Sequence, residues 1–183
     1  MGVAHHLPRT ECQTKPKNDS TMKTTTMSEP STTTQPAKVL YTAKTHTTGG
    51  REGGSSRTSD GRLEVKYSLP GGPGNGTNPE QLFAVGWSGC FLSAIKHVAA
   101  QMKVRLPADP VIDAEVDLCM GSDGYSLQAR LNVTLAGLDR QIAQTLLDGA
   151  HRTCPYSKAT RGNINVEINL IDSGSAQASG RKE

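Results

Sequence analysis

Aromatic residues and runs of basic residues are scarce in this sequence. Only seven of the 183 residues are Phe, Trp or Tyr, and a net charge of +3 is spread along the chain without a long Lys/Arg run. A nucleic-acid-binding surface usually combines clustered basic residues with rings on which bases stack. The composition therefore argues against nucleic acid as a partner.

The sequence also lacks an obvious membrane or secretion signal. No apolar stretch is expected to reach the roughly 20 residues that span a bilayer, and the first residues lack the apolar centre of a secretory signal peptide. We therefore expect no membrane partner and a soluble, cytoplasmic protein.

Metal-binding spacings are absent as well. The four cysteines include no Cys-x-x-Cys pair, and no His-x-x-x-His pair is found. A zinc site that adds His97 and His151 to the cysteines is thus disfavoured, and we expect no metal. A structural disulfide framework is also disfavoured, because Cys12 lies in a polar tail and the others are far apart. Cys119 falls within a predicted strand, where a structural role is expected.

Composition divides the chain into one domain and two tails. Residues 1–36 are rich in Thr, Ser, Lys and Pro and have few bulky apolar residues, so burial cannot offset the entropy of ordering them. We predict a disordered polar N-terminal tail over 1–36, a single domain over 37–172 and a flexible C-terminal tail over 173–183.

The first part of the domain has two strand patterns and a long apolar helix. Strands are predicted over 39–48 and 63–69. A loop is expected over 51–60, with 57–59 as a possible short extra strand, and another in the Gly/Pro-rich stretch 70–76. The helix begins at Thr77 or Asn78, where Asn78 precedes Pro79 at the first helical position, and runs to about Lys103. It is apolar nearly all round, which predicts a buried central helix.

The second part predicts a hairpin, a helix and a final strand. Alternating apolar residues over 111–120 and 125–136 flank the turn Gly121-Ser122-Asp123-Gly124. A helix is predicted over 139–151 and a last strand over 164–171. This order favours an α+β fold with antiparallel sheets.

Two cysteines in different surroundings suggest thiol redox chemistry. Cys90 lies in the middle of the apolar helix, and Cys154 heads Cys154-Pro155-Tyr156-Ser157 in a loop at the end of the second helix. A peroxidatic thiol needs a water-poor pocket, and a resolving thiol needs enough mobility to reach the oxidised sulfur. The two predicted locations meet both needs.

Three motifs in order give the chain a family resemblance. They are Asn-Pro-Glu-Gln-Leu-Phe at 78–83, Gly-Trp-Ser-Gly-Cys-Phe at 86–91 and Cys-Pro-Tyr-Ser-Lys-Ala-Thr-Arg-Gly-Asn at 154–163. Over about residues 38–171 the chain resembles the OsmC/Ohr superfamily, and within it the organic hydroperoxide resistance branch. The resemblance implies antiparallel sheets wrapped around two central helices in an intertwined homodimer, with active sites at the subunit interface.

The resemblance also implies catalytic roles. Cys90 would be the peroxidatic thiolate and Cys154 the resolving thiol, while Arg51, after Gly49-Gly50, would be the cation beside Cys90, held by the carboxylate of Glu80. A buried thiol needs such a cation, because burial alone disfavours the thiolate. A carboxylate suits the planar fork of an arginine.

The implied substrate is an organic hydroperoxide, which would include alkyl and fatty-acid hydroperoxides. The residues expected to line its apolar pocket are Phe83, Trp87 and Phe91. Reduction would release an alcohol, leave a sulfenic acid on Cys90 and then form a Cys90–Cys154 disulfide. No bound cofactor is expected, and the partner that recycles the disulfide would be an external dithiol such as a protein-borne dihydrolipoyl group.

Several alternatives remain open from the sequence. An OsmC-type peroxidase of the same superfamily would share both cysteines, a non-enzymatic redox sensor would use them as a switch, and a carrier would use only the apolar pocket. A Cys–His hydrolase with His97 or His151 lacks an oxyanion-hole signature. Arg57 or Arg161 could replace Arg51 as the cation, and Glu80 could serve only as a helix cap.

Overall fold

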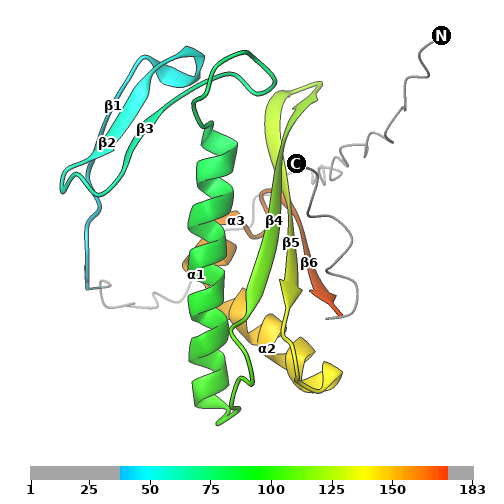
Figure 1. The fold of residues 1–183 in the computed structure, drawn as a ribbon. Coiled ribbons are helices and arrows are strands. Elements are labelled where there is room, and N and C mark those ends of the chain that lie inside the picture. Colours follow the sequence, from blue (N-terminus) through cyan, green and yellow to red (C-terminus); the bar gives the residue numbers. More distant parts are fainter. Residues whose placement is uncertain (1–37, 173–183) are drawn as a thin grey trace, which may run out of the picture. The chain divides into compact units, whose positions relative to one another are not determined.

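The computed structural model describes residues 38–172. The predicted tails at 1–36 and 173–183 lie outside the described residues. Within the described range the chain forms two compact units, residues 38–78 and residues 79–172, and each is described by itself. Figure 1 shows the elements of both units along the chain.

The smaller unit is a three-stranded antiparallel sheet in the order β1-β2-β3. Its strands are β1 (Thr45–Thr48), β2 (Ser55–Thr58) and β3 (Glu64–Lys66), and a 3₁₀ turn, η1 (Gly50–Glu52), connects the first two. Hydroxyl groups bridge the sheet: Thr47 Oγ1 lies 2.6 Å from Ser56 Oγ, which lies 2.6 Å from Tyr67 Oη. Polar cross-strand pairs therefore contribute to this sheet.

Three predictions for this unit need correction. The predicted loop 51–60 contains β2, which covers most of the possible extra strand at 57–59. β3 is shorter than the strand predicted over 63–69. β1 begins only at Thr45, and the residues that suggested an earlier start, Val39 and Tyr41, are 75% and 78% exposed. Apolar alternation overestimates β1 and β3 and misses β2, because the sheet also relies on polar side chains such as Thr47 and Ser56.

The larger unit combines one long helix, two shorter helices and a second three-stranded sheet. Its elements are α1 (Pro79–Gln101), β4 (Val111–Gly121), β5 (Gly124–Thr134), α2 (Arg140–Thr153), α3 (Pro155–Thr160) and β6 (Asn165–Ile171). Pro79 is the first residue of α1, as predicted. The two-residue turn Ser122–Asp123 joins β4 to β5, so the hairpin prediction is also confirmed. Asp139 caps α2 by accepting hydrogen bonds from the backbone N–H groups of Gln141 and Ile142.

The sheet of this unit is mixed, not wholly antiparallel. β4 pairs antiparallel with β5, whereas β6 pairs parallel with β5. The α+β class is confirmed, but the antiparallel prediction is wrong for β6. The reason is topological: β5 and β6 are joined through α2 and α3, and a helical crossover returns the chain in the same direction.

The core of the larger unit lies between α1, α2 and one face of the sheet. Its fully buried members include Trp87, Phe91 and Ile95 from α1, with Leu131, Val133, Leu146 and Leu147 from the sheet and α2. α1 is not buried all round, however, since Val85 is 72% exposed. Figure 1 shows α1 running beside the sheet along the length of the unit.

α1 also corrects the expectation about apolar stretches. By length and composition it is a helix that could cross a membrane. Between Glu80 and Lys96 it has no charged residue. Gly and Ser residues stand between the bulky apolar ones, so the apolar length of the helix is easily underestimated from the sequence. A core helix meets the same criterion, and the buried apolar residues of α1 belong to the core.

Candidate active site

The structure brings the two predicted redox cysteines together. The Sγ atoms of Cys90 and Cys154 lie 3.5 Å apart, although the residues are 64 positions apart in the sequence. Both are free thiols. A disulfide bond is about 2.05 Å long, so an approach of roughly 1.5 Å would join the two sulfurs.

Cys154 occupies a sharp corner between two helices. It ends α2, where its N–H donates to the carbonyl of Ala150 at 2.8 Å, and it precedes α3, whose first residue is Pro155. The prediction that Cys154 lies outside the helix, at the end of α2, is confirmed, but the expected loop is only this one residue, because the following residues form α3. Proline at the first helical position favours such a start, and the corner leaves Cys154 with no exposed surface.

The two sulfurs differ in accessibility and environment. Cys90 is half-buried, whereas Cys154 is fully buried. Burial raises the pKa of the Cys90 thiol, and the hydrogen bond with Cys154 raises that pKa further; the backbone N–H of Tyr156 acts in the opposite direction. Cys90 is therefore the more accessible residue of the pair, but its thiolate needs additional stabilisation.

Aromatic side chains of α1 and α3 pack against one another, within a few residues of Cys90 and Cys154 in the sequence. The rings of Phe83 and Trp87 meet edge to face with centroids 5.4 Å apart, and the ring centroids of Phe83 and Tyr156 are 6.0 Å apart. Gly86 lets Tyr156 approach α1, because a Cβ at that position would lie 2.9 Å from Tyr156 Oη. The Nε1–H of Trp87 donates to Ser157 Oγ at 3.3 Å.

Known proteins are similar to this chain in sequence and fold. The OsmC-like protein family matches residues 72–169, which is more than half of the chain. The chain belongs to the OsmC/Ohr family. The predicted resemblance and the OsmC/Ohr-like α+β fold are thereby confirmed.

Relatives of this family are similar along nearly their whole length. The organic hydroperoxide resistance protein of Xanthomonas axonopodis pv. citri is 47% identical over 138 residues, which are 74% of this chain and 97% of the relative. The crystal structure of OhrB from Bacillus subtilis matches with a TM-score of 0.69 and 40% identity, covering 73% of this chain and all of that one. An organic hydroperoxide resistance protein from Legionella pneumophila matches with a TM-score of 0.68 and 42% identity, covering 73% of this chain and 98% of that one.

The other two predicted catalytic residues lie in different units. Arg51 lies half-buried in η1 of the smaller unit, where Gly49 and Gly50 adopt φ values of 73° and 64° that glycine allows readily. Glu80 is buried in the first turn of α1 in the larger unit. A carboxylate there is favoured by the helix dipole. The pairing of Arg51 with Glu80 and with Cys90 stays a prediction.

The alternative cations have other surroundings. Arg57 is exposed in β2 of the smaller unit. Arg161 donates to the backbone carbonyl of His151 at 2.6 Å. Within residues 38–172, no group of three or more His, Cys, Asp or Glu side chains is placed to hold a metal ion.

The predicted substrate-binding residues differ in burial. Trp87 and Phe91 have no exposed surface and belong to the core, and their contact with a substrate stays a prediction. Phe83 is half-buried, and Tyr156 is 37% exposed. Sequence reasoning missed Tyr156 and Ser157 as site residues, although both lie in the Cys154-Pro155-Tyr156-Ser157 motif that signalled the site.

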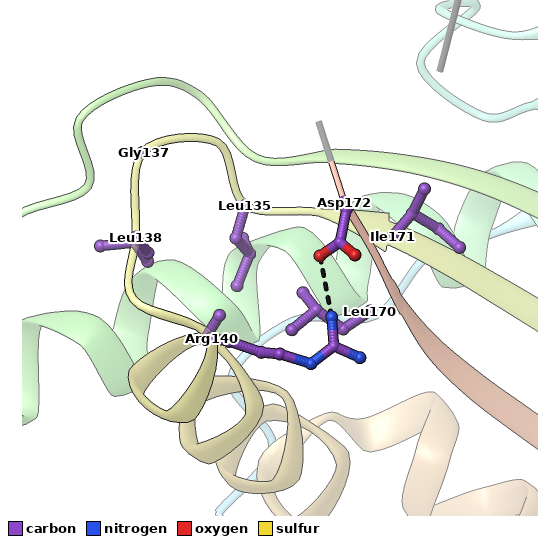
Figure 2. A pocket seen from close by; sticks show the side chains of 8 residues that line it. Leu135, Gly137, Leu138, Arg140, Leu170, Ile171 and Asp172 are labelled. Atoms are coloured by element: carbon purple, nitrogen blue, oxygen red, sulfur yellow. Dashed lines mark hydrogen bonds and ion pairs between the residues drawn. The ribbon is translucent and has the colours of Figure 1, made fainter. Parts of the chain in front are cut away.

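A cavity elsewhere in the larger unit lies away from the thiol pair. It has a volume of about 170 Å³ and is lined by Leu135, Gly137, Leu138, Arg140, Ala143, Leu170, Ile171 and Asp172. Figure 2 shows Arg140 and Asp172 joined across it by an ion pair of 2.8 Å. The cavity adjoins the start of α2, whereas Cys154 follows the end of this 14-residue helix, about 20 Å further along its axis. It has no part in the thiol chemistry.

Proposed function

We propose that this protein is a cysteine-based peroxidase that reduces organic hydroperoxides to alcohols. The observation that best supports this function is the 3.5 Å separation of Cys90 Sγ and Cys154 Sγ. The relatives named organic hydroperoxide resistance proteins support the same class of substrate.

In the first step the Cys90 thiolate attacks the terminal oxygen of the hydroperoxide. The O–O bond breaks, the alkoxide leaves and takes up a proton as the alcohol, and Cys90 becomes a sulfenic acid. Cys90 suits this role better than Cys154, because Cys90 is partly exposed and Cys154 has no surface that a peroxide could reach.

In the second step Cys154 attacks the sulfur of the Cys90 sulfenic acid. The S–S bond forms, the S–O bond breaks and water leaves, so the two thiols have together supplied the two electrons that reduced the peroxide. The buried position of Cys154 protects this thiol from external oxidants, and its proximity to Cys90 makes the second step intramolecular.

Stabilisation of the attacking thiolate is assigned to Arg51 and Glu80. Burial raises the pKa of Cys90, so a neighbouring guanidinium is needed to favour the charged form near neutral pH. Glu80 would hold that guanidinium through paired hydrogen bonds.

Selectivity for organic peroxides is assigned to the aromatic side chains near the thiol pair. Phe83 and Tyr156 are the members of this group with accessible surface. Contact between their rings and an alkyl chain would add binding energy of about 25 cal/mol per Å² of apolar surface buried. Hydrogen peroxide has no alkyl chain and gains none of it.

Recycling is assigned to an external dithiol such as a protein-borne dihydrolipoyl group. Its first thiol attacks the Cys90–Cys154 disulfide to form a mixed disulfide, and its second thiol releases the reduced protein and leaves as a cyclic disulfide. This chemistry suits a reducing compartment, in agreement with the predicted cytoplasmic location.

A homodimer is part of the same proposal. Val85 on α1 and the segment Val39–Tyr41 expose large apolar side chains, which water disfavours and a second subunit would cover. Light scattering during size-exclusion chromatography should give the mass of two chains. A single-chain mass at micromolar concentration would contradict this part alone.

The test of the function is consumption of tert-butyl hydroperoxide by the purified full chain with dihydrolipoamide as reductant. Wild type should turn over, and should prefer this substrate to hydrogen peroxide. Cys90→Ser should abolish turnover, while Cys154→Ser should stop after one equivalent with a dimedone-reactive sulfenic acid on Cys90. Cys119→Ala is a further test: Cys119 lies in β4 and is disulfide-bonded, so this variant asks whether that disulfide takes part, and it should retain turnover.

Three results would separate the alternatives. No turnover by freshly reduced wild type with dihydrolipoamide or dithiothreitol would overturn the peroxidase. Disulfide formation with peroxide, but no multiple turnover with either dithiol, would favour a redox sensor. Ligand binding that survives Cys90→Ser in a protein without peroxidase activity would favour a carrier.

A further inference from the structure

A buried hydrogen bond next to the thiol pair has no role in the chemistry described so far. It joins Trp87 Nε1–H on α1 to Ser157 Oγ on α3, two residues 70 positions apart, and both residues have no exposed surface. An indole N–H in a core requires an acceptor. A fully buried polar link between two helices restricts how they can pack.

The position of this hydrogen bond follows the position of the thiols. Trp87 lies three residues before Cys90 on α1, and Ser157 lies three residues after Cys154 at the start of α3. Residues three apart in a helix lie on the same face about one turn from each other. The hydrogen bond and the contact between the sulfurs therefore connect the same two segments, about one helical turn apart.

We propose that the Trp87–Ser157 hydrogen bond is a positioning device that fixes α3 against α1 and thereby sets the Cys154–Tyr156 segment relative to Cys90. Trp87 and Ser157 act through their neighbours and do not touch the reacting atoms. The functional meaning of this inference rests on the proposed peroxidase chemistry, but its geometry does not.

Tyr156 is the residue through which this positioning would reach Cys90. Its ring lies beside Gly86 and Phe83, and its backbone N–H acts on Cys90 in the direction that favours the thiolate. Displacement of α3 would withdraw this N–H and also increase the distance from Cys154 to Cys90.

The experiment measures the pH profile of Cys90 alkylation by iodoacetamide, followed at the Cys90 peptide by mass spectrometry. Ser157→Ala should raise the apparent pKa of Cys90 and lower the alkylation rate at pH 7 by about three- to tenfold. It should also slow disulfide closure after one equivalent of peroxide. Thr160→Val is the matched control, because the Thr160 hydroxyl bonds only to carbonyls within α3 in the described contacts, and it should leave the profile unchanged.

A second variant separates positioning from general loss of packing. Trp87→Phe keeps a ring in the core and removes the N–H donor, so it should shift the profile in the same direction. Ser157→Ala added to Trp87→Phe should then cause no further shift, because the hydrogen bond is already absent. If Ser157→Ala does not fold, the shift expected for Trp87→Phe decides the question.

The inference is overturned if folded Ser157→Ala, or Trp87→Phe in its place, keeps the wild-type pH profile of Cys90 alkylation. It is also overturned if Thr160→Val shifts that profile equally. The same holds if the shifts caused by Ser157→Ala and Trp87→Phe simply add in the double variant. Wild-type turnover is measured separately. A shift without any wild-type turnover would reject the peroxidase and retain the positioning role. Turnover without a shift would reject the positioning role alone.

Discussion

Substitution of Gly86 by alanine should separate stability from activity. In the interior of α1 this change favours the helix by about 0.8–1 kcal/mol through propensity alone. The new Cβ would lie 2.9 Å from Tyr156 Oη and 3.4 Å from Cζ. Ordinary contact begins near 3.4 Å, so the phenol must retreat by about 0.5 Å.

Tyr156 can make this movement at little cost to folding. The phenol oxygen is the far end of a flexible side chain, and the residue is 37% exposed. We therefore expect Gly86→Ala to leave the free energy of unfolding unchanged or to raise it by up to about 1 kcal/mol. Turnover of a bulky substrate should nevertheless fall, by about three- to tenfold, because the displaced residue follows Cys154 by two positions and contributes to the proposed substrate wall.

The assay compares kcat/KM for cumene hydroperoxide with the urea midpoint of unfolding. Tyr156→Phe removes the hydroxyl that the new Cβ would meet, so Gly86→Ala combined with Tyr156→Phe should recover the activity of Tyr156→Phe alone. If Gly86→Ala gains stability and keeps full activity, or if the double variant stays as impaired as Gly86→Ala, the contact between Gly86 and Tyr156 does not set the site geometry.

Two further predictions concern the stability of the larger unit. Arg130 donates to Glu115 and to both carboxylate oxygens of Asp117, and its hydrogen bonds lower the pKa of Asp117. The stability that this lowered pKa of Asp117 provides is fully present above the unfolded-state pKa of about 3.9. It is lost as the pH falls through the lower pKa of the folded state. Arg130→Met should therefore reduce the free energy of unfolding at pH 7 by about 1–3 kcal/mol and flatten its decline below pH 4; urea titrations with an unchanged acid slope would contradict the pairing. Asp139→Ala removes the cap that accepts from Gln141 N and Ile142 N at 2.9 and 3.2 Å and should cost about 1 kcal/mol, whereas Asp139→Asn should recover most of it; equal urea midpoints for wild type and Asp139→Ala would refute the role of the cap.

The elements that the sequence predicts well are those with local signals. Pro79 at the first position of α1, the two-residue turn between β4 and β5 and the Asp139 cap each involve neighbours in the chain. Strands with polar pairing were predicted poorly, since β2 has no apolar alternation to reveal it. α3 was missed because its six residues are too few to show a helical period.

The two cysteines and their family could be identified from the sequence, because motif order and residue type are properties of the chain itself. The tertiary structure alone decided that Cys154 is buried at a helix corner 3.5 Å from Cys90, that β6 runs parallel to β5, and that Trp87 bonds to Ser157. These features join residues tens of positions apart. Such contacts depend on how helices and strands pack, and short-range patterns in a sequence do not contain that information.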